Sequence, residues 1–260
     1  MPTTLVWFRD DLRVTDNPAL AYAASRGEVA GLLIDDTSGP RPLGRAAAWW
    51  RERSIASLSA KLPLIRETGD PREIVPRVAQ QLNAEVVWNR RYDATELDAE
   101  IKRRVGARTF PGFLLAEPWE ITTGSGTPYR VFTPFYNAVR QHLVAHPPEP
   151  LAAPALPGGQ AFDAPEAPAW AAELDAHNTP GEDAALQRFH DFLDGLANGR
   201  RYDNNDLSPG ATSGLSAHLR FGELSPGYVW AETAAFADGH PTAAADAWAF
   251  LRQVVWREFA

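Results

Sequence analysis

Short apolar runs alternate with amphipathic segments along the first 145 residues of the chain. The runs are rich in β-branched and aromatic residues and predict buried strands, at residues 4–8, 29–34, 62–65, 85–88 and 108–110. Helical spacing fills the intervals, at residues 43–62, 71–82 and 95–104, and Asp16 or Asn17 caps a further helix that begins at Pro18. This alternation predicts right-handed crossovers and an α/β fold with a Rossmann-like, doubly wound parallel sheet.

The pattern changes after a helix predicted at residues 133–144. Pro and Ala dominate residues 146–170, and such a composition favours an extended, semi-rigid linker. Beyond it the apolar positions have helical spacing, at residues 182–197, 225–236 and 241–260. We therefore predict an α/β domain at residues 1–145, a linker at 146–172 and an all-α segment at 173–260.

The last predicted helix, residues 241–260, is apolar on more than one side. Its apolar residues are Trp248, Leu251, Val254, Val255 and Phe259. A helix of this kind needs partners all round it. We expect the helical segment to expose a large apolar patch, which in a monomer marks an interface.

Composition narrows the function classes. The 260 residues include no Cys, which excludes disulfides and thiolate chemistry and suits a cytoplasmic protein. No apolar run approaches the length of a membrane span. The formal net charge of -8 argues against bulk attraction to nucleic acid, so a DNA-facing groove would need locally concentrated Arg and Lys. His142 and His146 have helix-facing spacing, but Pro147 follows them and no metal site is expected.

Hydroxyl side chains gather in the stretch 200–226. Thr212, Ser213 and Ser216 follow a glycine turn, where they can cap a new helix whose N–H groups and dipole attract phosphate. Leu215 and Leu219 lie four residues apart and share the inward face, and Ser225 caps a second helix. Two capped surface helices without a ligand would give the same local pattern. Neither a GxGxxG nor a GxxxxGK phosphate loop occurs in the chain.

Several motifs together resemble those of the DNA photolyase/cryptochrome family, in particular class I-like deoxyribodipyrimidine photolyases. The matching stretches are WFRDDLRVTDNPAL at 7–20, NRRYD at 89–93, EPWEI at 117–121, TPYRVFTPFYNAV at 127–139, TSGLS at 212–216, HLRFGELSP at 218–226 and WREF at 256–259. The resemblance implies an antenna-chromophore α/β domain followed by a helical FAD-binding domain. Family members continue well beyond residue 260, so the resemblance also implies that the chain is truncated within that helical domain.

The resemblance implies an enzyme, a light-driven lyase. Reduced FAD, held in a helical cavity, transfers an electron to a pyrimidine dimer flipped out of DNA. The implied FAD contacts are Tyr202, Thr212, Ser213, Gly214, Leu215, Ser216 and Arg257. The implied catalytic residues are Trp256, which stacks on the flipped bases, and Gln253, which we expect on the same helix face. Base stacking of this kind is worth ~1–3 kcal/mol per base.

The chain departs from the family pattern at three positions. Gln253 replaces the usual Glu of cyclobutane-dimer enzymes, which leaves cyclobutane photolyase, (6-4) photolyase and cryptochrome open. Asp206 replaces an arginine four residues after Tyr202 and removes a phosphate contact. Pro111 lies where folate-using relatives can carry a carboxylate, so among the candidate second chromophores (folate, a deazaflavin or a flavin) folate is disfavoured, and a deazaflavin, a flavin or no second chromophore stay open equally.

Three functional interpretations follow. The leading one is repair of DNA containing pyrimidine dimers, with no membrane partner and with a second polypeptide as one way to complete the helical domain. The alternatives are a cryptochrome-like blue-light sensor or non-catalytic nucleotide-binding protein, and a fragment without independent function.

Overall fold

The computed structural model describes residues 3–38, 42–206, 208 and 210–259. Its centre is a five-stranded parallel sheet in the order β3-β2-β1-β4-β5. The strands are β1 (Thr3–Phe8), β2 (Glu28–Asp36), β3 (Leu64–Gly69), β4 (Glu85–Asn89) and β5 (Arg108–Phe110). Each predicted strand is present, but β3 begins two residues later than expected because Leu62 still terminates the preceding helix.

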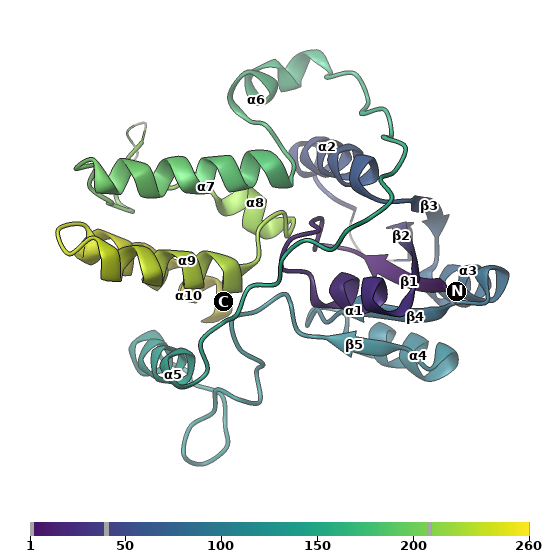
Figure 1. Ribbon diagram of the computed structural model, residues 1–260, viewed down its shortest axis with the longest axis horizontal. Coiled ribbons are helices and arrows are strands. Elements are labelled where there is room, and N and C mark those ends of the chain that lie inside the picture. Colours follow the sequence, from purple (N-terminus) through teal and green to yellow (C-terminus); the bar gives the residue numbers. More distant parts are fainter. Residues whose placement is uncertain (1–2, 39–41, 207, 209, 260) are drawn as a thin grey trace.

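Helices cover both faces of the sheet (Figure 1). The helices α1 (Pro18–Arg26) and α2 (Arg45–Lys61) pack on one face, and α3 (Pro71–Leu82) and α4 (Thr95–Val105) on the other. In β1, Val6 and Phe8 face the first pair of helices, while Leu5 and Trp7 face the second. Because successive strand residues point to opposite faces, one apolar run serves two cores. The predicted doubly wound α/β sheet is confirmed.

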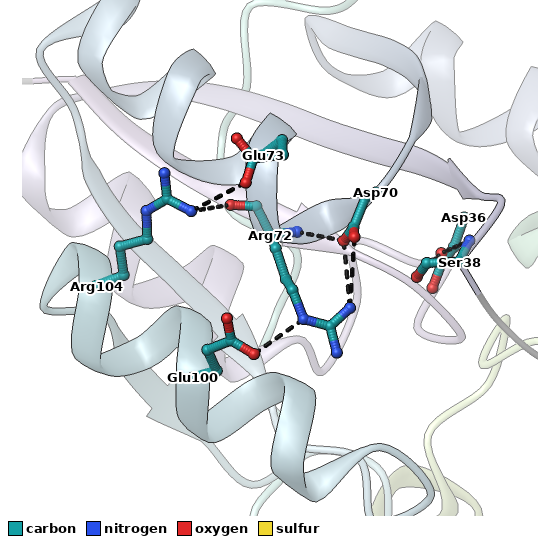
Figure 2. A network of polar contacts seen from close by, with 7 residues as sticks. All are labelled: Asp36, Ser38, Asp70, Arg72, Glu73, Glu100 and Arg104. Carbon is teal, nitrogen blue, oxygen red and sulfur yellow. Dashed lines mark hydrogen bonds and ion pairs between the residues drawn. The ribbon is translucent and has the colours of Figure 1, made fainter.

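Exposed ion pairs join the start of α3 to α4, as Figure 2 shows. The Arg72 guanidinium donates to Glu100 at 2.9 Å, and Arg104 donates to the Arg72 carbonyl at 2.8 Å and to Glu73 at 3.3 Å. Asp70 caps α3 by accepting the Arg72 N–H at 2.8 Å. Exposed pairs contribute little, about 0–1 kcal/mol each, so this network orients α4 more than it stabilises the domain.

Further helices form a second body beside the sheet. They are α5 (Phe132–Ala145), α7 (Glu182–Ala197), α8 (Ser216–Arg220), α9 (Pro226–Gly239) and α10 (Ala244–Phe259). The short helices η1 (Ala169–Ala171) and α6 (Ala172–His177) pack instead on the α2 side of the sheet, through Ala171 and Leu174. Phe132, Val139 and Leu143 of α5 share one apolar cluster with α7, α9 and α10. The chain therefore joins the helical core at α5, before residue 145. The predicted domain boundaries stay a prediction. Within the described residues, no helix is long and apolar enough to span a membrane.

The expected apolar patch around α10 is wrong. Among the described residues from 173 onward, Trp256 is the only large apolar side chain that is exposed. Helices α5, α7 and α9 cover the rest of α10. The expectation failed because α5, which we had assigned to the sheet domain, supplies a wall of the helical core.

The predicted linker is extended and follows the surface of the α/β part past α2 (Figure 1). It is tied down at three places. Asp16 and Leu151 exchange hydrogen bonds at 2.8 and 3.1 Å, the Gly159 N–H donates to the Ala60 carbonyl at 3.1 Å, and the Phe162 N–H donates to Ser59 at 2.8 Å. The segment is a strap fixed to the first domain along much of its length.

Candidate functional site

The loop after β1 joins the two bodies. Arg13 is fully buried, and its guanidinium donates to the carbonyls of Asp16 at 2.9 Å, Gly222 at 3.1 Å and Gly112 at 2.7 Å. The Leu12 N–H donates to the Phe221 carbonyl at 3.1 Å. Burial lowers the pKa of Arg13, although an arginine stays charged under any physiological condition. This loop stands at the position where a glycine-rich phosphate loop would follow the first strand. Here it binds the backbone that follows residues 216–220 of the helical body.

A buried carboxylate fixes α8 against α2. Glu223 has no exposed surface and accepts hydrogen bonds from the Trp50 indole at 3.0 Å, the Gly181 N–H at 2.7 Å and the Ser54 hydroxyl. Its second oxygen lies 2.5 Å from Nδ1 of the buried His218. A carboxylate that is shielded from water needs hydrogen-bond partners within the protein. The four partners of Glu223 therefore hold α8 in one orientation against α2.

A cleft of about 460 Å³ opens between the loop that precedes α8 and the facing side of α10. Eight of the nine predicted site residues line it: Tyr202, Thr212, Ser213, Gly214, Leu215, Ser216, Gln253 and Arg257. Phe250 and Val254 add apolar surface from α10. The structure thus brings together residues from two segments that lie about 40 positions apart in the sequence.

The hydroxyl-rich loop does not cap a helix as predicted. The helix α8 begins at Ser216 after Leu215, and no side chain caps it. Ser213 accepts only a long contact, 3.4 Å, from the Leu215 N–H, and the Thr212 and Ser216 hydroxyls form no hydrogen bond to another described residue. A helix of 5 residues also has too small a dipole to attract phosphate strongly. The hydroxyls instead line the cleft, and the buried Leu215 and Leu219 anchor the loop as expected.

Tyr202 forms one end of the cleft. Its N–H donates to the Asp246 carboxylate of α10 at 3.0 Å, and its ring packs edge-on against Phe192 and Phe250. Burial raises the pKa of Tyr202 above its ordinary value. The phenol is therefore a neutral donor at physiological pH.

Arg257 and Glu258 tie α10 to the loop after β5. The Arg257 guanidinium donates to the Phe113 carbonyl and to Glu258, both at 2.8 Å, and lies over the Phe113 ring. The Leu115 N–H donates to the other Glu258 oxygen at 2.7 Å. Burial raises the pKa of Glu258 to about 7, against the opposing effect of Arg257. Glu258 is not among the predicted site residues, although it lies inside the WREF motif at 256–259.

Trp256 lies outside the cleft, which corrects the expectation that it shares a helix face with Gln253. Its ring stacks on Phe132 of α5, with 3.6 Å between centroids and 8° between planes. Residues three apart on a helix are offset by about 60°. That offset lets Gln253 face the cleft while Trp256 meets α5.

A second cleft of about 460 Å³ lies at the carboxyl ends of β1 and β2. Ligands of open α/β sheets bind at the carboxyl ends of the strands, near the point where the strand order reverses, which here lies between β1 and β4. Its lining contains charged residues of both signs, among them Arg9, Arg51, Arg91, Asp35 and Asp36, and Arg51 pairs with Asp35. Pro111 is not part of the lining, so its identity does not decide what binds there.

Comparison with known proteins gives a consistent family. The chain is 38% identical over 278 residues to the deoxyribodipyrimidine photo-lyase of Agrobacterium fabrum, covering 98% of this chain and 57% of that protein. It is 28% identical to cryptochrome-2 of Arabidopsis thaliana, covering 87% of this chain and 42% of that one. The crystal structure of a bacterial class III photolyase from Agrobacterium tumefaciens superposes with a TM-score of 0.83 at 36% identity, covering 99% of this chain and 57% of the other.

The chain thus spans less than two thirds of the length of each of these relatives. The family profile described as DNA photolyase matches residues 4–155, which is more than half of the chain. The resemblance of the sequence motifs is confirmed, and this chain belongs to the DNA photolyase family.

Proposed function

We propose that the chain binds FAD in the cleft between residues 202–216 and α10, and that it serves light-driven repair of pyrimidine dimers in DNA. The convergence of eight predicted site residues on one cleft carries this proposal. The similarity to a deoxyribodipyrimidine photo-lyase supports the choice of reaction. FAD, when bound, supplies the light absorption and the electron transfer.

The residues of the cleft fit a flavin dinucleotide in two ways. The hydroxyls of Thr212, Ser213 and Ser216 are donors for phosphate oxygens, which charge-assisted hydrogen bonds favour. The half-buried Tyr202 ring lines the cleft together with the apolar residues Leu215 and Val254, which suits a flat ring system. The cleft thus has a polar end and an apolar wall, as a dinucleotide with a flavin ring requires.

On the substrate side, Gln253 lies in the cleft and can exchange hydrogen bonds with a base edge without changing charge. Trp256 is 41% exposed, and stacking on Phe132 occupies one face of its ring, which leaves the opposite face for a flipped base. Arg257, already bonded to Phe113, brings positive charge to the same end of α10. These catalytic roles form part of the proposal.

A second chromophore has a place in the cleft at the carboxyl ends of β1 and β2. Arginines and carboxylates of that cleft can hold a polar, ionisable ring. The donor set is compatible with folate, deazaflavin or flavin. Titration with each, followed by fluorescence quenching, would select among them.

The test of FAD binding uses titration of the purified chain. Replacing Ser213 and Ser216 by Ala removes two hydrogen bonds to a charged group, each worth about 1.5–3 kcal/mol, so Kd should rise on the order of 100-fold or more. Ser25 and Ser125, exposed hydroxyls elsewhere, give the control double variant. An unchanged Kd in the Ser213→Ala, Ser216→Ala protein would refute the assignment.

Repair is tested separately. Under blue light, the reduced, FAD-loaded protein should convert the pyrimidine dimers of damaged DNA back to pyrimidines. Bound FAD without repair would favour a light sensor over the lyase.

A further inference from the structure

A cleft of about 630 Å³ lies on the other side of the segment 212–214, against α7. It shares Thr212, Ser213 and Gly214 with the proposed flavin cleft, so this short hydroxyl-rich segment separates the two clefts. Two arginines, Arg188 and Arg200, also line it. Neither arginine has an ion-pair partner among the described residues, although the chain carries a net charge of -8.

Arg188 lies directly on the hydroxyl loop. A Cβ added to Gly214 would meet its Nη1 at 2.8 Å, and Gly214 itself has a φ of +67°, which favours glycine. Because no side chain intervenes, the guanidinium reaches the backbone of the loop. A half-buried, unpaired arginine in this position offers two parallel N–H donors, the arrangement that phosphate prefers.

The acidic residues nearby do not neutralise this arginine. Asp191 also lines the cleft, but its carboxylate accepts from the Gln187 amide at 2.8 Å. Asp206 stands where the family pattern has an arginine, and its carboxylate accepts from the Ser208 N–H at 2.8 Å and lines neither cleft. Residues 202–216 include no Lys or Arg, while α7 places an unpaired arginine against this segment.

We propose that Arg188 is a diphosphate-binding residue, which holds the FAD diphosphate over Thr212 and Ser213 in place of the arginine that Asp206 replaces. This inference rests on the proposed function and deepens it. Arg200, which packs over Gly195 at the outer edge of the same cleft, adds positive charge without direct contact to the hydroxyl loop.

The test compares ligands that differ in phosphate content. Titrations with FAD, riboflavin and ADP are made for the unaltered chain, for Arg188→Gln, for Arg188→Lys and for the control Arg103→Gln, an exposed arginine on α4. Arg188→Gln should weaken FAD and ADP by about 10-fold to 100-fold, the loss expected for hydrogen bonds to a charged group. Riboflavin, which has no phosphate, should bind equally to all four proteins.

Further outcomes separate the inference from the function on which it rests. Arg188→Lys should recover part of the FAD affinity, and the salt dependence of FAD binding should flatten in Arg188→Gln. Equal losses for riboflavin and FAD would mean that Arg188 only supports the loop, and unchanged FAD and ADP affinities would also overturn the inference. Binding of ADP that depends on Arg188, without any flavin binding, would refute the FAD proposal and leave the diphosphate site standing.

Discussion

Glu258 makes the stability of the protein depend on pH in an unusual direction. Its carboxyl group is buried between α10 and the loop after β5, and desolvation raises its pKa from the ordinary 4.5 to about 7. The change to test is Glu258→Gln. The glutamine carbonyl can still accept the Leu115 N–H, but the side chain no longer titrates.

The sign follows from proton linkage. Between about pH 4.5 and pH 7 the folded protein holds a proton that the unfolded chain releases, so the stability falls as the pH rises through this window and is level above it. The interval between 4.5 and about 7, at about 1.4 kcal/mol per pKa unit, corresponds to about 3 kcal/mol. No screening by solvent reduces this figure, because the side chain is almost fully buried.

Urea unfolding at pH 5, 6, 7 and 8, followed by the fluorescence of the nine tryptophans, measures the effect. Relative to the unaltered protein, Glu258→Gln should gain about 2.5 kcal/mol between pH 5 and pH 8, the part of the effect that falls in this range, since other titrating groups cancel in the difference. Glu166→Gln, an exposed carboxylate of the linker, should show no such gain. Parallel pH profiles for the unaltered protein and Glu258→Gln would refute the reasoning, because they would mean that Arg257 already compensates the burial.

Two further predictions concern the contact between the two bodies and the linker. Gly222→Ala should lower the free energy of unfolding by about 2–4 kcal/mol, because a Cβ would lie 2.0 Å from the Asp10 carbonyl oxygen at a residue whose φ is +63°. The control Gly239→Ala, which has open space around its Cβ, should change the free energy of unfolding by less than about 0.5 kcal/mol. Equal effects of the two substitutions would contradict this prediction. Limited digestion with a Glu-specific protease should cut first after Glu166, in residues 163–167, which are largely exposed and form no hydrogen bonds to other described residues. Early cleavage within residues 3–110 would count against it.

Features that depend on local periodicity could be predicted from the sequence. The five strands and the helices of the α/β part followed from apolar runs and helical spacing, and the caps followed from single residues. Asn17 accepts the Leu20 N–H and Ser225 accepts two N–H groups of α9, as their positions before Pro18 and Pro226 indicated. Each of these signals lies within a few residues of the element that it specifies, so the sequence carries it directly.

Features that depend on contacts between distant segments could not. The Trp256 ring stacks on Phe132, more than 120 residues away in the sequence, and no pattern within α10 contains that information. The hydroxyls of residues 212–216 look like helix caps locally, but α8 starts too late to use them. Likewise, Glu223 reads as an ordinary surface glutamate until Trp50, Ser54 and His218 surround it. In each case the partner is supplied by the fold.

Loops of the α/β part hold both walls of the proposed cofactor cleft. One wall begins at α8, which the Leu12 N–H and Arg13 hold through the carbonyls of Phe221 and Gly222. The other wall, α10, is bonded through Arg257 and Glu258 to the backbone of the loop after β5. Both anchoring loops leave the carboxyl ends of sheet strands, so the sheet helps to set the spacing of the two walls, together with the direct packing of the walls on each other. A ligand that requires both walls therefore reports on the integrity of the α/β domain, even though every residue that lines its cleft lies beyond residue 200.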